Sequence, residues 1–255
     1  MFPDLFSIGP FTLHTYGVFV AAGFLTGLVV AVKIGKSEGI SPQQTMDMGF
    51  FMIAAGILGS RLLYILMNLS YYLDRPLDMV KMWEGGLVFS GGIVCVILAL
   101  LWYTRRHRLS FWKIADIWAP AMAIGQAIGR IGCFMAGCCY GKPTGSDWGV
   151  VFTDPRSLAP LNVPLHPTQL YSSGLNLIVF FILILLHRKK EFEGQVFLWL
   201  LVLHSTARLF VERFRGDDRG MIFQSGMTVT QLVTLVILMG AILALFIFKR
   251  RHTRN

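Results

Sequence analysis

Four charged or titratable side chains recur at helical spacing near residue 210. His204, Arg208, Glu212 and Arg215 lie three or four positions apart, so an α-helix of 3.6 residues per turn would place them on one face. Two arginines and one carboxylate give that face a net positive charge, and guanidinium groups bind phosphate through paired hydrogen bonds. The face therefore predicts recognition of an anionic lipid head group, with a self-neutralising Arg208–Glu212 ion pair as the structural alternative.

Another arginine, Arg130, lies between Gly129 and Gly132, where an apolar stretch becomes rich in glycine. Arginine at a helix end can extend its long side chain to the membrane interface, but glycines on both sides also allow backbone to approach a ligand closely. Arg61 falls inside another apolar stretch. An ionised side chain at such depth is costly and needs a partner or a water-filled cavity. These arginines are the first candidates for a functional role.

After Arg130, three cysteines lie within a span of seven residues, at Cys133, Cys138 and Cys139. They could be zinc ligands, a redox pair or small apolar fillers. Two of them are adjacent and no matching Cys or His pair occurs elsewhere, which weighs against zinc, so we expect no metal and no cofactor. An oxidising compartment would allow a disulfide, although adjacent cysteines are poorly placed to bond each other.

Three shorter motifs lie at the edges of apolar stretches. Proline suits the first helical turn in His166-Pro167-Thr168-Gln169-Leu170-Tyr171, and an interfacial tyrosine in His14-Thr15-Tyr16-Gly17 is common in membrane proteins. Glycine pairs flank Ser90 at residues 85–86 and 91–92. Plain helix packing explains such pairs in membranes more often than ligand approach does.

Membrane-spanning helices would position these residues. The chain of 255 residues is 55% hydrophobic and only 15% charged, less charge than a soluble domain of this length carries. A bilayer core of roughly 30 Å requires about 20 helical residues. The first run lacks a basic leader and a cleavage site, so we expect it to be retained. The fold expected is an all-α membrane protein of about seven transmembrane helices, near residues 15–33, 48–68, 87–104, 115–136, 170–187, 196–212 and 228–248.

The basic residues alternate between the two sides of these helices. With the N-terminus outside, the cytoplasmic segments hold 13 Lys and Arg residues and the outer segments hold seven. The positive-inside rule then favours an outer N-terminus and a cytoplasmic C-terminus. The net charge of +9 is explained in this way and predicts no nucleic-acid partner. We expect one membrane-embedded domain over 1–255, with outer loops at 69–86, 137–169 and 213–227.

Taken together and in order, these motifs resemble the bacterial prolipoprotein diacylglyceryl transferase family along nearly the whole chain. The matching segments are 14–17, 59–64, 83–92, 129–141, 166–171 and 208–218. The resemblance implies an enzyme that moves the diacylglyceryl group of phosphatidylglycerol onto the lipobox cysteine thiol of a prolipoprotein precursor and releases glycerol phosphate. It also implies a multi-pass protein of the bacterial cytoplasmic (inner) membrane.

The resemblance further implies roles for individual residues. Arg130 and Arg208 would hold the phosphate and stabilise charge on the leaving group, Glu212 would orient Arg208, and Tyr16 would hydrogen-bond the head group. The other expected catalytic positions are His14, Ser90 and Cys133. The expected substrate-binding positions are Arg61, Gly85, Gly86, Gly91, Gly92, Gly141, His166, Gln169, His204 and Arg215.

The chain departs from the family pattern at its expected active site. Ser90 stands where the family usually has a histidine, and Cys133, Ala136 and Cys138 stand where it usually has Asn, Asn and Glu. Three accounts follow: a base among His14, His166 and His204, arginines that alone lower the pKa of the substrate thiol, or a changed acceptor with a covalent thioether or thioester on the chain's own cysteines.

Two other classes of protein compete with the transferase. A membrane thiol–disulfide oxidoreductase would use Cys133 with Cys138 or Cys139, but it leaves the arginines without a task. A transporter of an anionic solute would use the arginines, but transporter folds often show an internal repeat, and none is visible in this sequence.

Overall fold

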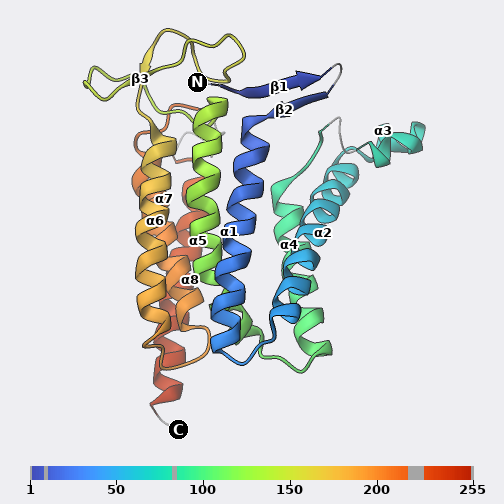
Figure 1. Cartoon of the computed structure of the whole chain (residues 1–255), viewed down its shortest axis with the longest axis vertical. Coiled ribbons are helices and arrows are strands. Elements are labelled where there is room, and N and C mark those ends of the chain that lie inside the picture. Colours follow the sequence, from blue (N-terminus) through green and yellow to red (C-terminus); the bar gives the residue numbers. More distant parts are fainter. Residues whose placement is uncertain (1, 9–10, 82–84, 218–226, 254–255) are drawn as a thin grey trace. The chain divides into compact units, whose positions relative to one another are not determined.

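The protein is mostly helical (Figure 1). A computed structural model describes residues 2–8, 11–81, 85–217 and 227–253. Its helices are α1 (Thr15–Ser37), α2 (Pro42–Met67), α3 (Leu69–Asp74), the 3₁₀ helix η1 (Pro76–Val80), α4 (Phe89–Arg106), α5 (Phe111–Ala136), α6 (Thr168–His187), α7 (Gln195–Glu212) and α8 (Val229–His252). Each of the seven expected apolar runs coincides with one long helix.

Within the described residues, six helices are long and apolar enough to cross a membrane: α1, α2, α4, α6, α7 and α8. Large apolar side chains on them are exposed, such as Leu25 at 59%, Phe181 at 57% and Met239 at 67%. Contiguous exposed apolar surface of this kind marks a lipid-facing side. The chain is therefore a multi-pass membrane protein. Helix α5 is not among the six; it carries Lys113, Asp116 and Arg130 within its 26 residues.

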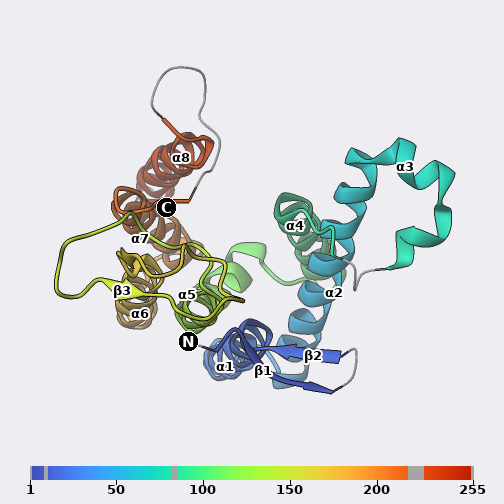
Figure 2. The same ribbon diagram turned by 90° about the horizontal axis from the view of Figure 1, so that it is seen from above.

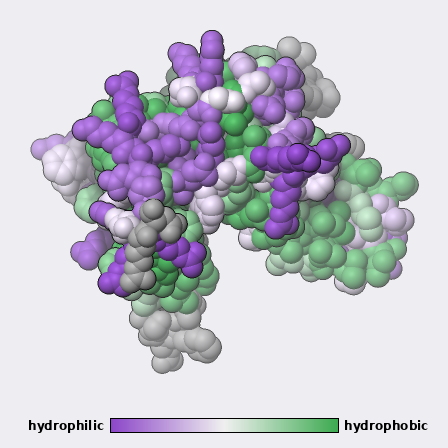
Figure 3. All heavy atoms as spheres, turned by 90° about the horizontal axis from the view of Figure 1, so that it is seen from below, coloured by the Kyte–Doolittle hydropathy of each residue, from purple (hydrophilic) through white to green (hydrophobic). Residues whose placement is uncertain are grey.

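Hydrophilic residues gather over part of the face seen in Figure 3, and the last turn of α8 carries Lys249, Arg250 and Arg251. Two small antiparallel sheets, which the sequence analysis did not anticipate, add to the helices: β1 (Asp4–Ile8) with β2 (Phe11–His14), and β3 (Val150–Val151) with β4 (Pro164–Leu165). Phe152, Ala159 and Leu165 form a buried apolar cluster, so the segment 137–169 has a small core of its own.

The chain forms two compact units, Met1–Ala31 with Ala115–Asn255, and Val32–Ile114. In the first unit α6 packs on α7 and α7 on α8 (Figure 2). Small side chains bring α1 close to α5: a Cβ on Gly23 would lie 2.7 Å from the Gly125 carbonyl oxygen, and one on Gly27 would lie 2.9 Å from that of Ala121. Glycine permits this close approach of two helix backbones.

A buried carboxylate joins α5 to the start of α7. Asp116 is fully buried, and its two oxygens accept hydrogen bonds from the backbone N–H groups of Gly194, at 2.8 Å, and Phe197, at 2.9 Å. The first N–H groups of a helix have no partner inside the helix. Asp116 therefore caps α7 from a distant part of the chain and fixes where that helix begins relative to α5.

In the second unit, α2 and α4 pack through glycines. A Cβ on Gly91 would run into the carbonyl oxygen of Gly59, and one on Gly92 would lie 2.9 Å from that of Gly56. Close packing of the two helices thus requires glycine at positions 91 and 92. This agrees with helix packing, the commoner of the two explanations given for the pair in the sequence analysis. Trp83 and Glu84, in the same sequence motif, lie outside the described residues.

Candidate active site

A narrow pocket, which we call the arginine pocket, lies among α5, α6 and α7 in the first unit. It encloses about 10 Å³, room for about one water molecule. The sequence analysis singled out three of its lining residues, and the structure brings them together from two helices. The pocket is lined by Arg130, Ser172, Leu175, Asn176, His204, Ala207, Arg208 and Val211.

Arg208 uses only part of its guanidinium within the protein. Its Nη2 lies 2.9 Å from Oε2 of Glu212, so the ion pair weighed as an alternative exists. Its Nη1 is buried and has no hydrogen-bond partner among the described residues. The unused N–H groups belong to a side chain that is only 13% exposed. A buried cation with unused donors is the arrangement expected of an anion site.

Glu212 extends the connection toward α8. Its Oε1 accepts a hydrogen bond of 3.3 Å from the hydroxyl of Thr228, the residue that caps the N-terminus of α8. Glu212 is thereby held between Arg208 and α8, which supports the expectation that it orients the arginine. The expectation that Arg215 lies on the same helical face is wrong, because α7 ends at Glu212.

The imidazole of His204 is oriented by a residue that the sequence analysis missed. Its Nδ1 lies 3.1 Å from Oδ1 of Asn176, and Nδ2 of Asn176 donates to the Ser172 carbonyl oxygen at 2.8 Å. Since Oδ1 can only accept, the neutral imidazole carries its proton on Nδ1 and its lone pair on Nε2. The one available signal was that Asn176 is the only polar side chain in the apolar run 175–186.

Tyr16, at the start of α1, lies beside the end of α5. A Cβ on Gly132 would lie 3.3 Å from the Tyr16 carbonyl oxygen, and the phenol is within electrostatic range of Arg130 and Cys133. Tyr16 is 45% exposed. A hydrogen bond from its hydroxyl to a lipid head group stays a prediction.

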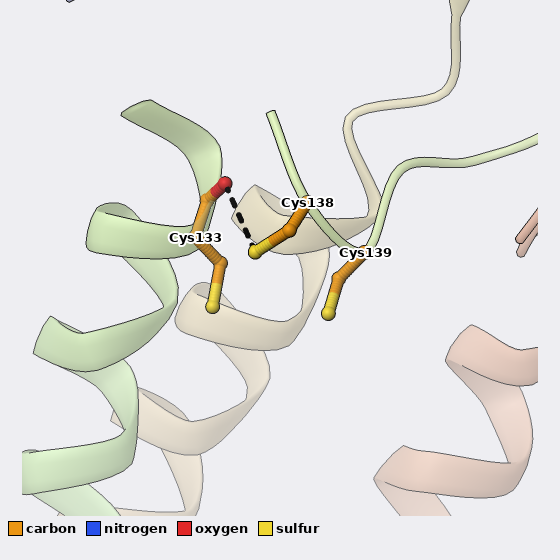
Figure 4. A group of neighbouring side chains, drawn as sticks. All are labelled: Cys133, Cys138 and Cys139. Atoms are coloured by element: carbon orange, nitrogen blue, oxygen red, sulfur yellow. Dashed lines mark hydrogen bonds between the residues drawn. The ribbon is translucent and has the colours of Figure 1, made fainter. Parts of the chain in front are cut away.

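The three cysteines converge at the C-terminal end of α5 (Figure 4). All are free thiols, and their sulfur atoms lie within 4.8 Å of one another. Hydrogen bonds with the Cys133 and Cys138 thiols, helped by the Arg215 guanidinium, lower the pKa of Cys139 well below its usual range. The hydrogen bond with Cys133 is the main reason that the pKa of Cys138 is raised.

Arg215 is buried and forms a two-bond ion pair with Asp217, at 2.8 and 2.7 Å. The hydrogen bonds to Asp217 and Cys139 raise its pKa, against the opposing effect of burial. Its backbone bridges to Gly141, whose N–H donates to the His166 carbonyl oxygen at 3.1 Å. A Cβ on Gly141 would lie 2.8 Å from the Phe214 carbonyl oxygen, so three chain segments meet where only glycine fits.

Two residues of the 166–171 motif hold this junction. His166 Nδ1 lies 3.3 Å from the hydroxyl of Tyr171. Gln169 is almost fully buried, and its Nε2 donates to the Cys138 carbonyl oxygen at 2.8 Å. Both contacts give these residues an architectural role; substrate binding by them stays a prediction.

Arg61 lies in the second unit, where backbone carbonyl oxygens surround its guanidinium. It is 4% exposed and donates to the carbonyl oxygens of Asp78, Met79, Gly85 and Gly86 at 2.6 to 3.3 Å. Gly86 has φ +73°, and a Cβ there would lie 2.8 Å from Arg61 Nη1. Arg61 thus organises the segment after η1 beside a pocket of about 330 Å³ that it lines with Tyr64, Tyr71 and Tyr72.

A family model described as prolipoprotein diacylglyceryl transferase matches residues 3–247. The chain belongs to this family. Curated relatives named phosphatidylglycerol–prolipoprotein diacylglyceryl transferase include those of Clostridium tetani, 35% identical over 97% of both chains, and Geobacter sulfurreducens, 34% identical over 98% of this chain and 96% of the relative. That of Bacillus velezensis is 31% identical over 97% of this chain and 92% of its own length. These relatives favour the transferase interpretation and give no support to the oxidoreductase interpretation.

Among the possible bases of this diacylglyceryl transferase family member, His14 and His204 differ in surroundings. The His14 side chain is 68% exposed and lies 2.6 Å from Asp4, which also pairs with Arg156 at 3.1 Å. His14 therefore belongs to a surface group of polar contacts with Asp4 and Arg156, whereas His204 lines the arginine pocket. Ser90 is exposed in the first turn of α4, in the second unit.

Proposed function

We propose that this chain transfers the diacylglyceryl group of phosphatidylglycerol to the lipobox cysteine thiol of a prolipoprotein and releases glycerol phosphate. Family membership supports the reaction. One observation supports Arg208 and Arg130 as the residues that bind the phosphate: Nη1 of Arg208 is unused, and it lies in a pocket that Arg130 also lines. Arg130 itself has no ion pair with any described residue, so both guanidinium groups are available to one phosphate.

In the reaction, the substrate sulfur bonds to the glyceryl carbon that carries the phosphate ester, and the carbon–oxygen bond breaks. The thiol proton goes to a base, and the bonding electron pair leaves on the phosphate oxygen. The leaving group gains negative charge, which Arg130 and Arg208 would stabilise. Glu212 would hold Arg208 in position through their 2.9 Å contact, and Tyr16 would donate a hydrogen bond to the head group.

His204 is the histidine best suited to accept the thiol proton. Its Nδ1 proton is held by Asn176, which leaves the lone pair of Nε2 available within the pocket. A base must lie within hydrogen-bond reach of the proton that it removes, and His204 lines the same pocket as both arginines. This base would compensate for Ser90, which replaces the usual family histidine.

The pocket must widen to admit a phosphate, because it encloses only about 10 Å³. Rotation of the Arg130 side chain would open it without breaking an ion pair to the described residues. An approaching phosphate would then replace water around two partly buried cations, which favours binding.

For the membrane topology we propose seven spans, with α5 as the seventh, in one membrane-embedded domain of the bacterial inner membrane. The N-terminus would be outside and the C-terminus cytoplasmic. The excess of Lys and Arg in the segments after α1, α4, α6 and α8 supports this orientation. Helices α1, α6 and α7 pack on α5, and its Asp116 is fully buried, so this charged side chain faces protein instead of lipid.

The direct test incubates the purified chain in detergent with phosphatidylglycerol and a lipobox peptide and follows the products by mass spectrometry. We expect a diacylglyceryl adduct on the peptide thiol and one glycerol phosphate per adduct. Arg213→Ala is the matched control for Arg208→Ala, since Arg213 is exposed just beyond the same helix. Glycerol phosphate without a modified peptide, or an adduct on the chain's own cysteines, would show a different acceptor; no product at all would refute the proposal.

A further inference from the structure

The three cysteines near the end of α5 form a cluster whose geometry the transfer reaction does not use. Cys133 lies on the last turn of α5, and the chain then reverses through Gly137 at φ +74°. The reversal brings Cys138 and Cys139 back beside Cys133, with all three sulfur atoms within 4.8 Å of one another. Figure 4 shows the sulfur of Cys138 directed toward Cys133, and a 3.7 Å hydrogen bond joins it to the Cys133 carbonyl oxygen.

Buried side chains of α6 hold the two loop cysteines in place. The Thr168 hydroxyl donates to the Cys139 carbonyl oxygen at 2.7 Å, and the Gln169 amide donates to that of Cys138 at 2.8 Å. Both donors are at most 1% exposed. The cluster is therefore fixed by contacts that do not involve the thiols, and a ligand could exchange without rearranging the backbone.

A second observation points to a ligand at the cluster. Oε1 of Gln169 is buried and has no hydrogen-bond partner among the described residues, although its own amide nitrogen contacts Cys138. A buried acceptor without a donor is costly. A water molecule bound to a metal ion among the thiols could supply the missing donor.

We propose that Cys133, Cys138 and Cys139 bind a thiophilic divalent metal ion, of which Zn²⁺ is the biological example. Metal–sulfur bonds of about 2.3 Å in tetrahedral geometry separate the sulfurs by roughly 3.8 Å. The three sulfur atoms lie at most 4.8 Å apart, and small side-chain rotations would bring them to this separation. Three thiols would release three protons and bind one ion, and a water would take the fourth position.

The surrounding charges suit such a complex. Three thiolates with one divalent ion carry one net negative charge, and Arg130 lies one helical turn before Cys133. The Arg215 guanidinium also interacts with Cys139. Cations close to a thiolate complex offset its charge, so the site is electrostatically compatible with its position among buried groups.

The test measures metal binding by the full chain in detergent, after removal of metal by a chelator under reducing conditions. We expect about one Cd²⁺ per chain, with ultraviolet sulfur-to-metal charge-transfer absorption and a rise in Tm that a chelator reverses. Cys139→Ser and Cys138→Ser should each weaken binding by at least 100-fold. Cys95→Ser, which removes the fourth cysteine from α4 in the other unit, should leave it unchanged.

Several outcomes would overturn the metal site. Absorption and stoichiometry that survive in both Cys138→Ser and Cys139→Ser would do so, as would the absence of any Cd²⁺-dependent absorption and Tm change in the unaltered chain. A disulfide between two of the three cysteines in protein isolated from membranes, read as the loss of two hydrogens by mass, would assign a redox role instead. None of these readouts uses lipid transfer, so they are independent of the transferase proposal.

Discussion

Oδ1 of Asn176 on α6 and Nδ1 of His204 on α7 lie 3.1 Å apart at the wall of the arginine pocket. The amide is itself fixed by its hydrogen bond to the Ser172 carbonyl oxygen. Asn176 on α6 thus sets the tautomer and direction of an imidazole on the next helix. Such an orienting partner commonly accompanies a catalytic histidine.

Replacing His204 by glutamine is expected to lower kcat by about 100-fold or more, the usual contribution of a general base. Asn176→Leu keeps the branched shape of the side chain but removes the acceptor, so we expect a loss of roughly tenfold while His204 remains. The measurement is the rate of peptide modification at saturating phosphatidylglycerol. Ser173→Ala is the control on α6, since its hydroxyl donates to Ala127 instead. A His204→Gln variant with unchanged kcat would exclude this residue as the base.

Substitutions of the two pocket arginines should separate charge from geometry. Arg208→Ala and Arg130→Ala are each expected to lower kcat/KM by roughly 100- to 1,000-fold, as loss of a charge-stabilising donor does. Arg208→Lys keeps the charge but loses the paired N–H geometry, so an intermediate loss is expected. All variants should still insert in the membrane, as judged by yield and elution volume. A fully active Arg208→Ala enzyme would remove the arginine pocket from the mechanism.

Asp116→Ala should destabilise the protein without changing its chemistry. The substitution leaves two buried N–H groups at the start of α7 without their acceptor, which costs about 1–3 kcal/mol in the free energy of unfolding. The expected result is a lower Tm in detergent, with the transfer rate retained at low temperature. Asp147→Ala, at an exposed position in the segment 137–169, is the control. Equal Tm values for the two variants would contradict the capping role.

The glycine contact between α2 and α4 can be tested within one interface. A Cβ on Gly91 would collide with the Gly59 carbonyl oxygen, whereas a Cβ on Gly56 would make an ordinary 3.6 Å contact with Val96. Gly91→Ala is therefore expected to destabilise the protein by about 1–3 kcal/mol, and Gly56→Ala to have little effect. Thermal unfolding of both variants gives the comparison, and a tolerated Gly91→Ala would show that the two helices separate readily.

Arg61→Lys tests whether Arg61 organises the protein or binds substrate. Lysine cannot reach the four carbonyl oxygens that the guanidinium contacts, so tryptic cleavage after Lys81 should become faster. Arg75→Lys, at an exposed position just before η1, should leave the rate of cleavage after Lys81 unchanged. Unchanged cleavage with a raised KM for phosphatidylglycerol would assign Arg61 to substrate binding.

The roles of several polar residues depend on hydrogen bonds between distant segments, which the sequence alone could not predict. Asp116 and Gly194 are far apart in the chain, and only the packing of α5 on α7 shows that they are partners. In the sequence Asn176 is one polar residue in an apolar run, and only the folded structure shows that it contacts and orients His204. Arg215 was expected on the face of Arg208, but α7 ends first and its guanidinium turns to Asp217 and Cys139.

The sequence by itself determined the membrane character, the positions of the long helices and the family. These properties depend on local composition and on residue order: about 20 apolar residues span a bilayer wherever they fold, and an ordered series of motifs needs no coordinates. Spacing alone weighed against a metal at Cys133, Cys138 and Cys139, because it lacks a familiar ligand pattern. Only the tertiary structure brought their sulfurs together, since the reversal at Gly137 and the contacts from α6 are properties of the folded chain.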